Sequence, residues 1–160
     1  MARDEADRED LMAEATALRE RVELELPGQA GPVVAGFREN GACSIYFGPD
    51  PVFHYDDGGG LRRAFVAGDL YRSQGRTLAR LTRTRTGSAV HLVRHDLGSS
   101  ELARFLADMR DRLQRLHEAL FNGSAKVVRQ VPVEIDVRSR LLVALTAARQ
   151  GHLSQALKKR

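Results

Sequence analysis

Arginine is the side chain most able to do chemistry in the middle of this chain. Residues 62–95 hold eight arginines against one aspartate. They are Arg62, Arg63, Arg72, Arg76, Arg80, Arg83, Arg85 and Arg94. A guanidinium group can donate two parallel hydrogen bonds to a phosphate or a carboxylate. The segment therefore predicts a binding site for an anionic partner, either a nucleic acid or an acidic protein, whose charge the arginines would neutralise.

The spacing of these arginines is typical of a β-strand ending in a turn at Gly87. On a strand, Arg80 shares a face with Arg76, and Arg83 and Arg85 lie on the other face. A protruding two-stranded ribbon rich in arginine and threonine fits a groove of nucleic acid. The alternative is a solvated sheet face, or one neutralised by acidic residues elsewhere. The aromatic content of 6% and the lack of tryptophan argue against RNA recognition through base stacking.

A run of three glycines in residues 53–65, FHYDDGGGLRRAF, raises the question of a phosphate-binding loop. Such loops need a helix after the glycines, and the P-loop also needs a lysine. Here the following residues alternate and include Phe65, which predicts a strand. The glycines are therefore expected to form a hairpin tip, where positive φ angles are needed. Arg62 and Arg63 should then point to opposite faces, with Asp56 or Asp57 as a partner for the inward one.

Histidines offer two weaker possibilities for chemistry. His91 and His95 would share a zinc ion on a helix, but their segment alternates like a strand. On a strand these residues lie about 13 Å apart, which is too far for one ion. His54 and Tyr55 could line a pocket between sheet and helices, as in a small-molecule-binding protein or a hydrolase. Neighbouring strand residues face opposite ways, however, so we predict no catalytic residue, no metal and no cofactor.

Length and composition indicate one domain spanning residues 1–160. The formal net charge is +4, yet residues 3–25 hold nine acids against four arginines. The chain has a single cysteine, Cys43, expected to be a buried core residue. No apolar run reaches the roughly 20 residues needed to cross a bilayer. The acidic start is unlike a secretory signal, so we expect a cytoplasmic protein with no membrane partner.

Helices are predicted at residues 4–25, 99–121 and 136–150, followed by a short basic tail. The first has apolar residues at Leu11, Ala15, Leu18 and Val22 and is expected to stop at Pro27. The second carries apolar residues alternately four and three apart: Leu102, Leu106, Met109, Leu113, Leu116 and Leu120. This stripe should pack on a sheet, but it also fits a helix that joins two copies of the chain. Gly151 is expected to end the third helix.

Short runs rich in β-branched and aromatic residues fill positions 33–95. Turn signals separate them, among them Asn40-Gly41, which favours a tight hairpin. A further extended piece is expected just after residue 125. The predicted fold is α+β, an antiparallel meander of about five to seven strands with the helices packed on one face.

One segment also resembles a known group of proteins. Residues 45–71, IYFGPDPVFHYDDGGGLRRAFVAGDLY, are similar to a segment of small uncharacterised bacterial proteins. The resemblance implies a shared sheet and no particular activity.

Taken together, the sequence favours a non-enzymatic binding or accessory domain that presents arginines on a sheet. The alternatives are an assembly protein that forms a homo-oligomer such as a dimer through its leucine-rich helices, and a small-molecule-binding protein or hydrolytic enzyme with a pocket near His54.

Overall fold

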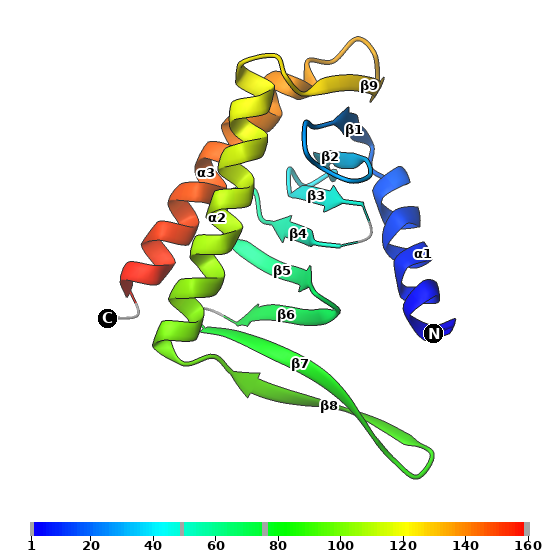
Figure 1. Ribbon diagram of the computed structural model, residues 1–160, viewed down its shortest axis with the longest axis vertical. Coiled ribbons are helices and arrows are strands. Elements are labelled where there is room, and N and C mark those ends of the chain that lie inside the picture. The colour runs from blue at the N-terminus through cyan, green and yellow to red at the C-terminus, as the bar shows by residue number, and fades with distance from the viewer. Residues whose placement is uncertain (1, 49, 75–76, 159–160) are drawn as a thin grey trace.

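The computed structural model describes residues 2–48, 50–74 and 77–158. These residues form a nine-stranded antiparallel sheet and three helices. Along the sheet the strands run in the order β8-β7-β6-β5-β4-β3-β2-β1-β9 (Figure 1). Each of the strands from β1 to β8 therefore pairs with its neighbour in sequence, and β9 is added beside β1. Among the described residues, no helix is long and apolar enough to cross a membrane.

The strands and helices have the following bounds. The strands are β1 (Glu20–Glu25), β2 (Val33–Phe37), β3 (Cys43–Phe47), β4 (Val52–Tyr55), β5 (Leu61–Val66), β6 (Asp69–Gln74), β7 (Thr77–Thr86), β8 (Ala89–Asp96) and β9 (Lys126–Val131). The helices are α1 (Ala2–Thr16), α2 (Ser99–Phe121) and α3 (Val137–Lys158). The α+β fold and its antiparallel meander are confirmed. The sheet is larger than the predicted five to seven strands because β1 and β9 extend it beyond β2.

The helix predicted for residues 4–25 is wrong in its second half. α1 ends at Thr16, and residues 20–25 form β1 between β2 and β9. The segment ERVELE alternates, with Val22 and Leu24 fully buried and charged residues between them. Alternation with a period of two suits a strand with one buried face. This burial overrides the weak helix preference of glutamate, leucine and arginine.

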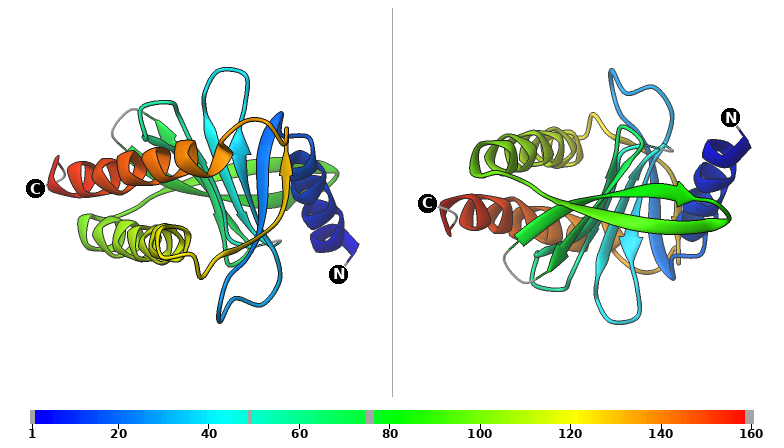
Figure 2. Two further views of the ribbon diagram at one scale, coloured as in Figure 1. Left: turned by 90° about the horizontal axis from the view of Figure 1, so that it is seen from above. Right: turned by 90° about the horizontal axis from the view of Figure 1, so that it is seen from below.

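The helices cover both faces of the sheet, which corrects the prediction that they all lie on one. α2 and α3 lie side by side over one face, while α1 lies beyond the other (Figures 1 and 2). Alternate residues of β2 show the division. Val33 and Ala35 join the core beneath α2 and α3. Val34 packs with Ala15 and Leu18 at the end of α1. The two-sided cover explains why every residue of β2, β3 and β4 is buried.

The apolar stripe of α2 is used inside the molecule. Its buried residues are Leu102, Leu106, Met109, Leu113, Leu116, Ala119 and Leu120. They share one core with α3 and the sheet. The stripe is therefore not available to join two copies of the chain, and the interpretation as packing on the sheet holds.

The triple-glycine segment is a hairpin tip, as predicted, and not a phosphate-binding loop. The tip is docked on α3. Asp56 Oδ1 accepts hydrogen bonds from the backbone N–H groups of Gly58 and Gly60, at 3.0 and 2.7 Å. Gly59 has a φ of +86° and lies against α3, where a Cβ at this position would meet the backbone of Ala147 at 2.6 Å. The carboxylate thus occupies the amides that a phosphate-binding loop would offer to its ligand.

α3 continues through Gly151 to Lys158, so the prediction that it ends at Gly151 and spans only 136–150 is wrong. A Cβ at position 151 would lie 2.6 Å from the carbonyl oxygen of Gly59. Glycine is present there because the hairpin tip approaches the helix closely, and not because the helix stops.

Replacing Gly151 by alanine should therefore destabilise the protein. In an unobstructed helix this change stabilises by about 1 kcal/mol. Here the clash with Gly59 should reverse the sign and cost about 1–3 kcal/mol. Urea denaturation of Gly151→Ala measures the difference, with Gln150→Ala, at an exposed neighbouring position, as a control expected to change stability by less than about 0.5 kcal/mol. A Gly151→Ala protein more stable than the wild type would contradict the docking of the tip.

Candidate anion-binding face

Cross-strand register brings four of the predicted arginines to one face of the sheet. Arg63 of β5 lies directly opposite Arg72 of β6, and Arg72 lies opposite Ala79 of β7. Residues opposite each other share a face, and side chains alternate along a strand. Arg83 and Arg85 are therefore on the face of Ala79. We call Arg63, Arg72, Arg83 and Arg85 the arginine face; it is the face on which α1 packs further along the sheet.

The arginine face is not neutralised. Arg72, Arg83 and Arg85 are exposed and Arg63 is partly buried. Among the side chains that the structure describes, no carboxylate forms an ion pair with any of the four. This includes Glu9, Asp10 and Glu14, the acids of α1 whose side chains the structure describes.

The other arginines of the segment lie differently. Arg94 of β8 is on the same face, opposite Leu81, but its Nε donates to Asp96 Oδ1 at 2.8 Å. Arg80 is on the opposite face, where it forms an ion pair with Asp69 at 4.0 Å. Arg76 lies outside the described residues. Alternation thus gathers some of the eight arginines and separates the others.

The end of the β7–β8 hairpin forms an arm that projects from the sheet. β6 pairs only with residues 77–81 of β7, so residues 82–93 extend beyond it (Figure 1). Every residue from 83 to 96 is exposed. On the arm, Arg83 lies opposite Leu92 and Arg85 opposite Val90, and both apolar side chains are 57% exposed. The arm therefore presents arginines interleaved with apolar side chains to solvent.

A β-bulge places Arg62 and Arg63 together, which corrects the expectation that they point to opposite faces. His54 pairs with Arg63 while the next residue, Tyr55, pairs with Leu61. Arg62 is therefore the extra residue, and a bulge of this kind redirects a side chain. Both arginines line one pocket of 490 Å³.

Arg38, which directly follows β2, also lines this pocket, which we call the arginine pocket. Its lining comprises Arg38, Asn40, Ala42, Ser44, His54, Tyr55, Asp56, Asp57, Arg62 and Arg63. Because Arg63 belongs to both, the pocket adjoins the arginine face. Asp56 and Asp57 line the pocket, but neither forms the predicted ion pair with Arg62 or Arg63 among the described residues.

Ser44 and His54 form the buried floor of the arginine pocket. Ser44 Oγ and His54 Nδ1 are hydrogen-bonded at 2.8 Å, and the two residues are 1% and 9% exposed. Burial, and then the positive charges of Arg63 and Arg38, lower the pKa of His54 to about 3. A general base works best with a pKa near the working pH. An imidazole with so low a pKa is a poor general base for taking a proton from serine.

His91 and His95 do not join a third metal-ligating side chain among the described residues. His91 and His95 lie on β8, and His95 Nε2 is hydrogen-bonded to Thr82 Oγ1 at 3.0 Å. Within the described ranges, no group of three or more metal-ligating side chains comes together.

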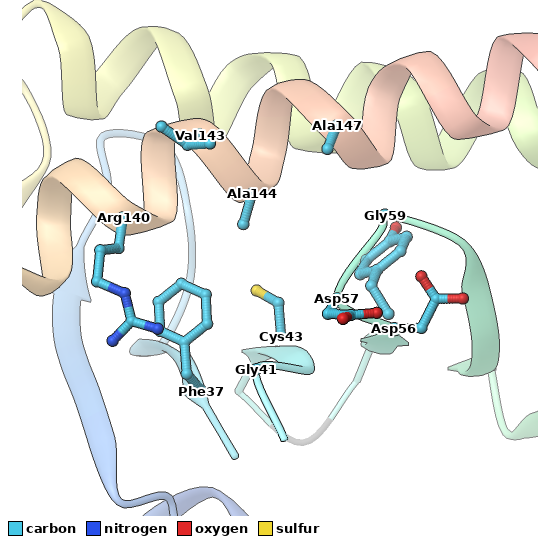
Figure 3. Close-up of a pocket in the computed structure, with 11 residues that line it drawn as sticks. Phe37, Gly41, Cys43, Asp56, Asp57, Gly59, Arg140, Val143, Ala144 and Ala147 are labelled. Carbon is cyan, nitrogen blue, oxygen red and sulfur yellow. The ribbon is translucent and has the colours of Figure 1, made fainter. Parts of the chain in front are cut away.

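A second pocket, of 290 Å³, lies between α3 and the ends of β2 to β4. Arg140 lies beside Phe37 at one end of it, with Asp57 and Gly59 at the other (Figure 3). Arg140 stacks over the Phe37 ring at 4.4 Å and forms an ion pair with Glu20, so its charge is already engaged. Burial raises the pKa of the Cys43 thiol to about 12, which leaves it unreactive. Among the described residues that line this pocket, none provides an activated nucleophile.

Sequence analysis missed Arg38 and Ser44. The pairing of Ser44 with His54 follows from the β3–β4 register, in which the two residues are directly opposite. The turn signal of GPDP at positions 48–51 could have given that register. Arg38 had no local signal, because only the fold carries it to Arg62 and Arg63.

Comparisons with known proteins found no match. No protein-family model matches the chain. The searches of curated proteins and of solved structures likewise gave no match.

The two buried histidines should make stability depend on pH. Burial, with a smaller effect of Arg110, lowers the pKa of His152 to about 4, and that of His54 is about 3. In the unfolded chain histidine has a pKa near 6.5. Below that pH the unfolded state binds protons that the folded state does not, so the free energy of unfolding should fall as pH drops from about 6.5 towards 4. The slope approaches about 1.4 kcal/mol per pH unit for each histidine.

Urea denaturation at pH 7, 6 and 5 measures this slope. His54→Asn removes one of the two buried histidines, so it should lower the slope of the unfolding free energy against pH by up to about 1.4 kcal/mol per pH unit. An NMR titration in which the His54 ring of the folded protein gains its proton between pH 6 and 7 would contradict the account.

Proposed function

We propose that the protein is a non-enzymatic binding domain that holds nucleic acid on its arginine face. The observation that carries the proposal is the alignment of Arg63, Arg72, Arg83 and Arg85 on one sheet face, with no carboxylate partner among the described side chains. An exposed row of guanidinium groups attracts phosphates and gains affinity by releasing their counterions.

A nucleic acid fits this face better than an acidic protein does. Arg83 and Arg85 lie two residues apart on the arm, and Arg72 and Arg63 lie on the same face of the neighbouring strands. Such a row suits a partner whose charges repeat regularly. The arm is a two-stranded ribbon, the shape that the major groove of a duplex admits. Val90 and Leu92 lie on the paired strand directly opposite Arg85 and Arg83 and would contact sugars or base edges. An acidic protein offers carboxylates at irregular positions.

Binding of this kind should depend little on base sequence. The chain is poor in aromatic residues, and those of β3 and β4, among them Tyr46 and Phe53, are buried. Contacts to phosphates position a protein on nucleic acid but do not identify bases. The proposed role is therefore to hold or shield nucleic acid.

Removing two arm arginines should weaken binding and its dependence on salt. Each phosphate contact contributes about 0.7 to 0.9 to the slope of log K against log salt. Arg83→Gln/Arg85→Gln should therefore make the slope shallower by about 1.4 to 1.8. Fluorescence anisotropy with a labelled duplex and a labelled single strand, between low and moderate salt, measures it.

The matched control is Arg104→Gln/Arg115→Gln, which removes two exposed arginines from α2, over the opposite face. Its affinity and salt slope should equal those of the wild type to within the small effect of net charge. Equal losses in both double variants would show non-specific attraction. No binding of the wild type at low salt, or preference for polyglutamate over nucleic acid, would refute the proposal.

A second candidate function is self-assembly, and the exposed edge of β8 favours it. β8 is the last strand of the sheet, so the outer side of its backbone lacks a strand partner among the described residues. It contains neither lysine nor proline, and Val90, Leu92 and Val93 are exposed. Such an edge can pair with the same strand of a second copy. Two arginine faces would then continue into each other.

Assembly through β8 predicts a concentration-dependent homodimer. Light scattering and sedimentation should show a dimer for the wild type and a monomer for Val90→Lys/Leu92→Lys. A wild-type protein that stays monomeric at high concentration would remove this candidate and leave nucleic-acid binding unaffected.

A further inference from the structure

We propose that the arginine pocket binds a phosphate monoester, and that on a bound nucleic acid it holds the terminal phosphate of a strand. The proposal rests on the proposed function and names a subsite of it. The site consists of Arg38, Arg62 and Arg63 around the Ser44–His54 floor.

The charges of the pocket favour an anion. Three guanidinium groups line it, and none forms an ion pair with a described carboxylate. Of its two aspartates, Asp56 is engaged with the amides of Gly58 and Gly60. Asp57 is exposed at the rim. The low pKa of His54 reflects, besides burial, the positive field of Arg63 and Arg38 at the floor.

The floor suits a phosphate because it is polar and uncharged. His54 is neutral at pH 7, so it adds no charge of its own. Ser44 and His54 together hold a hydroxyl and an imidazole at fixed positions beneath the arginines. Hydrogen-bonding groups fixed before the ligand arrives lose little freedom when it binds.

The continuity of pocket and face indicates which phosphate would enter. Arg63 lines the pocket and lies opposite Arg72, so a strand held by the arginine face leads towards the pocket. A terminal monoester carries a charge of about −1.5 to −2 and three acceptor oxygens. An internal diester carries a single charge. Three arginines in one pocket therefore favour the end of a strand over its interior.

The size of the pocket leaves room beyond the phosphate. Ligand pockets commonly measure about 300–1,000 Å³, and this one measures 490 Å³. Asn40 and Asp57 lie on its lining, where they can accept hydrogen bonds from a sugar hydroxyl or a base amine. A free nucleoside monophosphate offers the same chemistry as a strand end, and the two sources are separated by experiment.

The experiment compares a labelled single strand carrying a terminal phosphate, at the 5′ or the 3′ end, with the same strand ending in hydroxyls. The wild type should bind one of the phosphorylated strands about tenfold more tightly. Arg38→Gln/Arg62→Gln removes two pocket arginines that are not part of the arginine face. It should abolish the preference and retain the binding of the hydroxyl strand. Arg104→Gln/Arg115→Gln should keep the preference.

NMR gives an independent readout. Adenosine monophosphate, added alone, should shift the resonances of the His54 ring in the wild type but not in Arg38→Gln/Arg62→Gln. Binding of the mononucleotide without preference for a strand end identifies a free nucleotide as the ligand. Equal affinity for all three strands together with unmoved His54 resonances would overturn the pocket assignment.

The outcomes also separate the pocket from the proposed function. If the hydroxyl strand fails to bind while the mononucleotide shifts His54, the arginine face is not a nucleic-acid site but the pocket proposal survives. If the hydroxyl strand binds and neither the terminal phosphate nor the mononucleotide has an effect, the arginine face is supported as a nucleic-acid site and the pocket proposal fails.

Discussion

The register of the antiparallel meander is the constraint on which the rest of the structure depends. From β1 to β8, each strand pairs with its neighbour in sequence, and side chains alternate between two faces. A shift of one residue in any pairing would exchange the faces. The observed register puts Arg63 beside Arg72 and sends Arg80 to the opposite face. The anion-binding site proposed for this chain is thus a consequence of strand pairing, and not of any local motif.

Two deviations from regular pairing complete the arrangement. The bulge in β5 brings Arg62 to the same pocket as Arg63. The length of β7 and β8 carries Arg83 and Arg85 beyond the rest of the sheet. The leucine stripe of α2 and the thiol of Cys43 lie within the core, so neither is accessible to a partner. Among the described residues, the arginine face stays exposed and has no carboxylate partner.

Much of the fold could be predicted from the sequence, because its signals are local. Turn residues and alternation located the strand-rich region 33–95 that contains β2 to β8, and the spacing of the leucines located α2. β1 was missed because residues 4–25 contain good helix formers, and only pairing with β2 and β9 makes Val22 and Leu24 part of a strand. Gly151 was misjudged because its cause, the carbonyl of Gly59, is distant in the sequence. The arginine pocket joins residues from the end of β2 and from β5, so no local pattern could have shown it.

Mapping the contact surface by NMR tests the central claim most directly. Arginine side-chain Nε–H resonances can be followed while a single-stranded oligonucleotide is added at low salt. The account predicts the largest changes at Arg63, Arg72, Arg83 and Arg85, and none at Arg104 or Arg115 of α2. Changes centred on α2 and α3, or spread evenly over every arginine, would contradict it.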